Sequence, residues 1–332
     1  MFEQYFDRVY ENYDRYAIIP LALVLLSVGI LGASYMATAE FPYVQVENGS
    51  FSFTPGSVFE KGVEFSSGTE IQARLSSTPD VLEVERAFAS AGYPDAQATI
   101  GEPDADRPLI LVKLKESTKN KTEVAEILSG AGYTLPGGPD SIQLATYSPA
   151  VSQSFFTQAV VAVVLAFTTM SIVIFAAFKD ITPSLAVIFA ASGDIIFSLA
   201  MMSLLGIPLT LGTIAALLML IGYSVDTDIV LSSRVLKKTH GSLKSRIFSS
   251  LKTGVTMSSG GIVAFTILYI VAMGLVGAPS ILTEVASVMV IGLLADMPLT
   301  WFGNAYILKR YAEEEDWKPV ESMMDSRWLP WS

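Results

Sequence analysis

Long apolar stretches constrain this chain more than any other feature of its sequence. A helix of about 20 apolar residues crosses the hydrocarbon core of a bilayer. Stretches of that length, or close to it, stand at 17–36, 157–178, 185–205, 209–231 and 257–276. A further stretch, 281–308, is long enough although it contains Glu284 and Asp296. We therefore predict six transmembrane helices, the first of which is a signal anchor because no small-residue cleavage site follows it.

The composition agrees with a membrane protein and excludes several kinds of site. Only 16% of the 332 residues are charged, against about 25% in an ordinary soluble domain. The chain has no cysteine, which excludes disulfides and thiolate metal sites. Its single histidine, His240, excludes a histidine-cluster metal site. We expect no metal, no cofactor, no enzymatic activity and no nucleic-acid partner.

The distribution of Lys and Arg predicts the orientation in the membrane. Loops 206–208 and 277–280 carry no charge, whereas loop 232–253 is strongly basic and Lys309 and Arg310 follow the last apolar stretch. Short basic loops stay in the cytoplasm. We therefore place both termini in the cytoplasm and residues 37–156 outside the cytoplasmic membrane. This long segment holds 8 Lys and Arg and 16 Asp and Glu, which predicts an acidic surface.

Residues 37–156 have the pattern of a folded α+β domain. Alternation and breaker residues predict strands at 69–75, 96–100, 108–115 and 141–147 and helices at 79–92 and 119–131. The resulting order is β-α-β-β-α-β, which is the ferredoxin-like pattern. The fold class expected for the whole chain is an α-helical membrane bundle of six transmembrane helices with one ferredoxin-like extracytoplasmic domain. Asn48 and Asn120 stand in glycosylation sequons on that side.

These considerations divide the chain into five parts. We expect a cytoplasmic N-terminal segment (1–16), the first transmembrane helix (17–36), the extracytoplasmic domain (37–156), a five-helix bundle (157–308) and a cytoplasmic tail (309–332). The aromatic residues of the N-terminal segment fit an amphipathic helix in the headgroup layer or a plain aromatic belt before the first helix. The acidic tail either lies on the membrane or is disordered.

Acidic residues inside the apolar stretches are the candidate functional groups. Asp194 and Asp296 fall near the middle of their helices, and Asp226 and Asp228 fall toward the cytoplasmic end of 209–231. Such residues face the bundle interior and are typical of proton relays. Pairing with Arg234 or the loop lysines is the structural alternative for Asp226 and Asp228. For Asp194 and Asp296 the alternative is a hydrogen bond to a neighbouring helix, while Glu284 lies near the outer boundary as an interfacial residue.

Small residues in the same helices predict close packing. Gly212 and Ala216 are one turn apart, and the run 258–261 consists of two serines and two glycines. Such positions allow helix backbones to approach each other in a membrane.

Two motifs make the sequence resemble the SecF family, the smaller partner in the SecDF protein-export pair, in its archaeal form. GVEFSSGT (62–69) resembles the family element G-[IV]-[DE]-F-x-G-G-T and contributes Gly62, Glu64, Phe65, Gly68 and Thr69. GYSVDTDIVLSSRV (222–235) resembles the family signature G-Y-S-[IV]-[ND]-D-T-[VI]-V-[VI]-x-[DE]-R-[IV].

The alignment of the second motif shifts its acids. Without gaps, Asp226 meets the N/D position, Thr227 meets the principal Asp, and Asp228 meets the Thr. Arg234 keeps its place. Asp194 falls where the family carries an Asp after a His, with Gly193 in the position of the His.

The resemblance implies a function in protein export. Proteins of this family act with SecD beside the Sec translocon channel, and proton or sodium movement through the membrane part is thought to drive outer domains that pull the translocating preprotein. Membrane lipids complete the expected surroundings. The ion-coupling candidates implied are Asp226, Asp228, Asp194, Asp296, Thr227 and Arg234.

Two other functions are compatible with parts of the pattern. A small-solute exporter of the resistance-nodulation-division type would share the bundle, although one outer segment of 120 residues replaces its two large loops. An intramembrane aspartyl protease would need two membrane aspartates that share a proton, such as Asp226 and Asp296, but no GxGD motif stands at either position.

Overall fold

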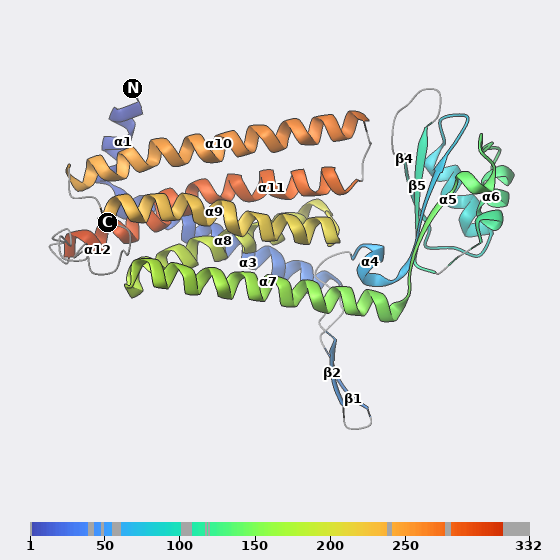
Figure 1. Ribbon diagram of the computed structural model, residues 1–332, viewed down its shortest axis with the longest axis horizontal. Coiled ribbons are helices and arrows are strands. Elements are labelled where there is room, and N and C mark those ends of the chain that lie inside the picture. The colour runs from blue at the N-terminus through green and yellow to red at the C-terminus, as the bar shows by residue number, and fades with distance from the viewer. Residues whose placement is uncertain are drawn as a thin grey trace, which may run out of the picture.

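The computed structural model consists of a helix bundle with a small sheet domain at one end (Figure 1). It describes residues 2–38, 43–47, 50–54, 61–100, 108–116, 118, 120–237, 241–275 and 280–314. The predictions for Asn48, His240 and the end of the acidic tail lie outside these residues. The hairpin of β1 (Tyr43–Glu47) and β2 (Ser50–Thr54) was not predicted.

Six helices of the described chain are long and apolar enough to cross a membrane, as predicted. They are built from α3 (Ile18–Thr38), α7 (Pro149–Phe178), α8 (Ile181–Leu205), α9 (Leu211–Lys237), α10 (Leu243–Leu275) and α11 (Ile281–Pro298), the last continued by a π-helical turn (Leu299–Asn304) and α12 (Ala305–Glu314). Helices α7 and α10 begin well before the apolar stretches at 157 and 257. Their polar first turns extend the helix because backbone hydrogen bonding does not stop where the apolar composition does.

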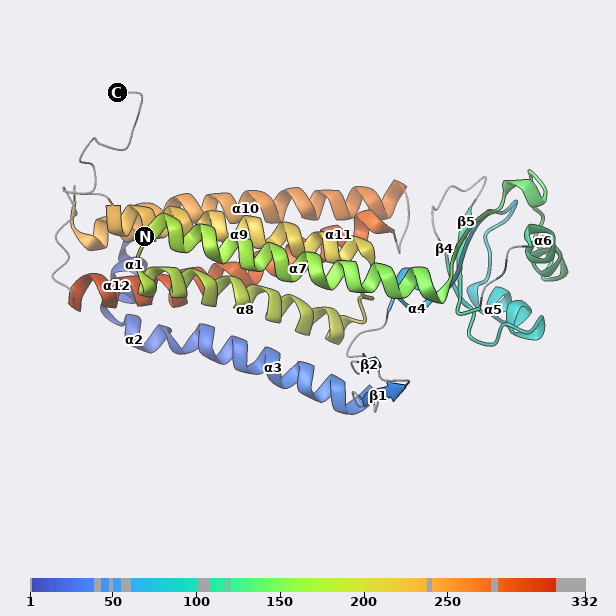
Figure 2. The same ribbon diagram turned by 60° about the horizontal axis from the view of Figure 1, so that its bottom comes forward.

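The bundle has three central and three peripheral helices. In the most apolar window of α8, α9 and α11, 50%, 50% and 56% of the residues are buried, against 11%, 11% and 17% in α3, α7 and α10. Helix α11 packs against α8, α9 and α10, and α3 packs along α8 at the edge of the bundle (Figure 2). The central helices therefore enclose the protein interior, and the peripheral helices present apolar side chains such as Val164 and Ile270 to their surroundings.

The sheet domain contains four antiparallel strands in the order β4-β5-β3-β6. Along the chain its elements are β3 (Gly68–Arg74), α5 (Val81–Ser90), β4 (Gln97–Ile100), β5 (Leu109–Leu114), α6 (Lys121–Gly130), a short 3₁₀ turn (Pro139–Ser141) and β6 (Gln143–Tyr147). The helices cover the face of the sheet that points away from the bundle (Figures 1 and 2). Alternate residues such as Ile71 and Val112 pack there against Phe88 and Leu128, so the predicted order of strands and helices is found.

The N-terminal segment packs on the end of the bundle opposite the sheet domain. It forms α1 (Phe2–Glu11) and α2 (Tyr13–Tyr16). The ring of Phe6 lies 4.8 Å from that of Phe248 on α10, and the hydroxyl of Tyr13 donates to the carbonyl oxygen of Trp301 at 3.0 Å. These aromatic residues therefore contact protein, which neither the amphipathic-helix nor the aromatic-belt interpretation anticipated.

Candidate functional site

Three aspartates lie buried in the centre of the bundle, one on each central helix. Asp194 on α8 is 1% exposed, and Asp228 on α9 and Asp296 on α11 are fully buried. These three aspartates point away from the lipid-facing surface of their helices, and their side chains meet in the bundle interior. The structure thus brings together three of the four predicted acids.

Hydroxyl and amide groups from the same bundle donate to these carboxylates. Ser224 donates to Asp194, and Ser258 donates to Asp296 at 3.0 Å. The Thr300 hydroxyl lies 2.9 Å from Asp228 Oδ1 and 3.1 Å from Asp296 Oδ1, and Asn304 Nδ2 donates to Asp228 Oδ1 at 2.8 Å. The resulting network joins α8 to α9, α9 to the π-helical turn, and α10 to α11.

Two of these donors come from one π-helical turn. It begins at Leu299, directly after Pro298, whose ring removes a backbone donor from the helix. A π-helical turn widens the helix and is frequent at functional sites. Thr300 and Asn304 both lie in this turn and both donate to Asp228.

The charge of the site is unbalanced. In the described part of the chain, the ion pairs lie elsewhere, for example between Lys244 and Asp7 at the end of the bundle. An ionised carboxylate buried without a cation is costly, and three in one site add mutual repulsion. Among the described residues, no group of three or more His, Cys, Asp or Glu side chains has an arrangement that could hold a metal ion. A site of this kind is suited to taking up and releasing protons.

The remaining candidates of the second motif lie outside the network. Asp226 is exposed on the outer surface of α9, although it stands only two residues before Asp228. Thr227 is buried against α10, beside Gly254. Arg234 donates to the carbonyl oxygen of Ser249 at 2.7 Å and to Thr253 at 2.8 Å, so it ties α9 to α10 and is not paired with an acid of the network.

The first motif forms the joint between the sheet domain and the bundle. The Gly62 N–H donates to the carbonyl oxygen of Leu209 at 2.8 Å, in the turn between α8 and α9. The following turn of helix, α4 (Val63–Ser66), inserts Phe65 into the bundle core. Gly68 has a φ of 133°, and a side chain there would meet the backbone of Leu114. The motif therefore fixes how strand β3 leaves the bundle.

Two further residues of this joint are polar. The Thr69 hydroxyl lies 3.3 Å from the carbonyl oxygen of Thr118 and 3.3 Å from the hydroxyl of Thr146. Burial raises the pKa of Glu64 above its ordinary value, and a hydrogen bond from its own backbone and the charge of Lys113 partly oppose this. Both residues serve the joint and lie apart from the aspartate network.

Glu284 on α11 lies at the same end of the bundle. It is 9% exposed and accepts a hydrogen bond of 2.5 Å from Thr210, and its predicted position near the outer boundary of the membrane stays a prediction. The turn that Gly62 contacts is thus also tied to α11.

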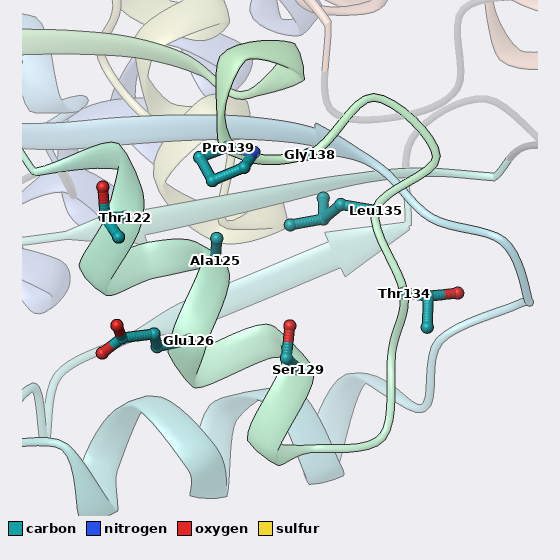
Figure 3. A pocket seen from close by; sticks show the side chains of 8 residues that line it. All are labelled: Thr122, Ala125, Glu126, Ser129, Thr134, Leu135, Gly138 and Pro139. Atoms are coloured by element: carbon teal, nitrogen blue, oxygen red, sulfur yellow. The ribbon is translucent and has the colours of Figure 1, made fainter.

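A cavity of about 480 Å³ opens on the sheet domain (Figure 3), and none of the buried aspartates lines it. One wall is α6, with Thr122, Glu126 and Ser129, and the other is the loop that carries Thr134 and Leu135. Its lining holds a single ionisable side chain, Glu126, and no sequence motif predicted it.

Sequence reasoning missed the donors of the aspartate network. Ser258 belongs to the run of small residues for which we predicted only packing, and Ser224 and Asn304 were not considered. Thr300 carried a usable signal, because it stands one helical turn after Asp296.

Comparison with known proteins gives one matching family. The family model described as "Protein export membrane protein SecD/SecF, C-terminal" matches residues 137–314. A protein-export membrane protein SecF of Methanocaldococcus jannaschii is 33% identical over 92% of this chain and 97% of its own length, and that of Pyrococcus furiosus is 39% identical over 91% and 92%.

Other matches are partial. The SecF of Methanothermobacter thermautotrophicus is 47% identical over 165 residues, which are 50% of this chain and 58% of that protein. The crystal structure of SecDF from Thermus thermophilus superposes with a TM-score of 0.67 at 21% identity, and the match covers 91% of this chain and 38% of that one. This likeness concerns the fold.

Proposed function

The chain belongs to the SecD/SecF family of protein-export membrane proteins and is of the SecF type, and we propose that it uses an ion gradient to assist polypeptide export. It is a multi-pass membrane protein and an accessory subunit of Sec translocation. The buried aspartates carry the proposal, because three acids without a described cation partner form a site that a proton can enter and leave.

Proton uptake would change the contacts between α9 and α11. The Thr300 hydroxyl has one hydrogen and two carboxylate oxygens within reach, so it satisfies Asp228 or Asp296 but not both at full strength. When one of these acids binds a proton, it becomes a donor and Thr300 can accept from it while donating to the other. Each protonation step therefore rearranges the contact between two central helices.

The joint at Gly62 gives this rearrangement a route to the sheet domain. Helix α9 begins two residues after Leu209, whose carbonyl oxygen accepts from the Gly62 N–H. A shift of α9 would pull on α4 and move the sheet domain, which would capture and release the translocating preprotein.

The sheet domain itself is proposed to be ferredoxin-like. Its order of elements and its antiparallel strand order support this proposal.

We also propose an orientation and the five-part division given above. Arg246, Lys252 and Lys309 lie at the end of the bundle opposite the sheet domain, on α10 and α12. Short loops and helix ends that are rich in Lys and Arg stay on the cytoplasmic side of the membrane. Both chain ends are then cytoplasmic, and residues 37–156 are extracytoplasmic and act beside the Sec translocon channel.

Asp226 supports the proposed partner. It lies exposed on α9 next to the exposed Tyr223, within a candidate membrane span. An ionised Asp at the centre of a lipid-facing helix costs about 2.5–3.5 kcal/mol on insertion scales. SecD is the partner of SecF proteins, and we propose that it covers this face and provides a hydrogen-bond donor to Asp226.

The test compares isosteric variants of the four acids in the complex with SecD. Asp194→Asn, Asp228→Asn and Asp296→Asn should each reduce the part of preprotein export that a protonophore abolishes. Asp226→Asn should leave the gradient-dependent part of export unchanged for each assembled complex, because its side chain lies outside the network and its proposed contact is with SecD. Export that responds to the protonophore as strongly in all three buried variants as in the unaltered protein would refute ion coupling at this site.

A further inference from the structure

Two serines of the central helices differ from the other serines of the bundle. A hydroxyl in a membrane helix commonly donates to the carbonyl oxygen four residues before it. Ser27, Ser171, Ser192, Ser250 and Ser287 do so at 2.6–2.9 Å. Ser198 on α8 and Ser232 on α9 are fully buried, and their hydroxyls have no hydrogen-bond partner among the described residues.

Each of these serines stands one turn from a buried aspartate that also has an unpartnered oxygen. Ser198 follows Asp194 by four residues, and Asp194 Oδ1 accepts no described hydrogen bond. Ser232 follows Asp228 by four residues, and Asp228 Oδ2 is likewise unpartnered. Side chains four residues apart on a helix have Cβ atoms about 5–6 Å from each other, a separation that one bridging water spans.

The two pairs lie on opposite sides of the aspartate network. Helix α8 runs toward the turn that contacts Gly62, so Ser198 lies nearer the sheet domain than Asp194 does. Helix α9 runs away from that turn, so Ser232 lies nearer α12 and the N-terminal segment than Asp228 does. The same motif, an aspartate with a free oxygen and a serine one turn further, thus faces each end of the bundle.

We infer that Asp194 with Ser198 and Asp228 with Ser232 each bind one water molecule, and that these two waters carry protons into and out of the network. A buried polar atom without a partner is costly, and a buried water is stable where it has two to four polar partners. A carboxylate oxygen accepts from the water, and the serine hydroxyl donates to it. A cation would need more oxygen ligands than the two that each pair supplies.

The chemical step at each pair is a proton transfer without loss of atoms or charge. A hydronium ion at the water site gives one proton to the carboxylate, which leaves a neutral water and a neutral carboxylic acid. The reverse step at the other pair returns the proton to water. The serine hydroxyl keeps the water in line with the free carboxylate oxygen, so it is a positioning residue.

This inference rests on the proposed ion coupling, and its first test does not depend on export. A structure of the purified complex with SecD, at a resolution that shows ordered waters, should contain a water within hydrogen-bond distance of both Asp194 Oδ1 and Ser198 Oγ, and another between Asp228 Oδ2 and Ser232 Oγ. Each water should be absent from the corresponding Ser198→Ala or Ser232→Ala complex. Absence of both waters from the unaltered complex would overturn the inference, whatever the export activity.

The second test measures gradient-driven export by the reconstituted complex as a function of pH. Ser198→Ala and Ser232→Ala should lower the gradient-dependent rate about tenfold, the factor expected from one lost hydrogen bond, and should shift its pH profile. Ser192→Ala and Ser250→Ala are the controls, because those hydroxyls donate to backbone carbonyls. Unchanged rates and profiles in the two Ala variants would overturn the proton-carrying role of the waters.

Glycine variants separate this role from a structural one. Ser198→Gly and Ser232→Gly remove the hydroxyl and its Cβ, which leaves room for a second water. If the waters carry protons, the Gly variants should export faster than the Ala variants despite the lower helix propensity of glycine. The reverse order would show that the serines matter through packing. Loss of coupling in Asp194→Asn and Asp228→Asn together with unaffected Ala variants would leave the proposed function intact and reject the inference.

Discussion

Thr300 bridges two acids of different helices, since its hydroxyl oxygen lies 2.9 Å from Asp228 Oδ1 and 3.1 Å from Asp296 Oδ1. Asp228 belongs to α9, and Thr300 follows Asp296 by one turn in the last membrane helix. This hydroxyl therefore links the two central helices at the level of the network, beside the hydrogen bond from Asn304 to Asp228.

Replacing Thr300 by valine removes this link without changing the shape of the side chain. We expect Thr300→Val to destabilise the protein by about 1–3 kcal/mol, because Asp228 and Asp296 lose the one buried hydroxyl that they share, and to reduce gradient-dependent export. Thermal unfolding and export assays of the complex with SecD measure both effects. Thr300→Ser keeps the hydroxyl and should retain most of both. Wild-type export by Thr300→Val would contradict a coupling role for this contact.

The parts of this architecture that depend on local pattern were predictable. The length of each apolar stretch sets a membrane helix, and the alternation of residues such as those of 69–75 sets a strand whose inner face, including Ile71, packs on the helices. Caps were local as well, since the Asn120 side chain accepts from the backbone of Thr122 and Glu123 at the start of α6.

The site was less predictable because it depends on which helix faces meet. Asp226 and Asp228 differ by about 200° around α9, so one faces the interior and the other the outer surface, and the spacing alone does not say which. Asp228 and Asn304 are 76 residues apart in the chain. The π-helical turn that carries Asn304 had only Pro298 as a signal in the sequence.

Asp226 should act through the contact with SecD. If a donor from SecD pairs with Asp226, Asp226→Leu should weaken co-purification of the two subunits, by about 1.5–3 kcal/mol for a hydrogen bond to a charged group. Leu165→Ala, on an exposed part of α7, is the control for loss of apolar surface elsewhere on the bundle. The measurement is the fraction of SecD retained as detergent concentration rises. Stronger retention in Asp226→Leu would indicate that this face meets lipid.

Close packing of α11 against α9 should depend on Gly292. A Cβ at this position would collide with the Leu220 side chain, whereas a Cβ at Gly260 on α10 would meet nothing within 4 Å. We expect Gly292→Ala to destabilise the protein by about 1–3 kcal/mol through overpacking. Gly260→Ala should be neutral or stabilise by up to about 1 kcal/mol, since alanine is the better helix former. Apparent unfolding midpoints of the two variants compare them directly.

The Gly292 prediction can be checked by rescue. Leu220→Ala creates space at the point where the added methyl group collides. The double variant Gly292→Ala with Leu220→Ala should therefore be more stable than the sum of the two single effects indicates, because residues in contact are not additive. Additive effects would show that the methyl group at 292 is accommodated by another shift.

Glu64 should make the joint between the domain and the bundle sensitive to pH. Burial raises its pKa in the folded protein, and the nearby charges are Lys113, which opposes the rise, and Glu70, which adds to it. Glu284 faces the same region from α11. An acid whose pKa is raised by folding favours the folded state most below its unfolded pKa, and this contribution is lost as the pH rises through the folded pKa. Glu64→Gln stays neutral at every pH and should therefore be more stable than the unaltered protein at neutral pH.

The measurement is the apparent unfolding midpoint of the full chain between acidic and neutral pH. The advantage of Glu64→Gln should grow as the pH rises from the ordinary range of a glutamate and should then level off. Glu126→Gln, on the exposed side of α6, changes the net charge equally and should show no such trend. Equal pH dependence of both variants would mean that the Glu64 charge is not what burial at the joint disfavours. A pH trend confined to Glu64→Gln would make this carboxylate a charge that weakens the docking of α4 on the bundle, separate from the aspartate network.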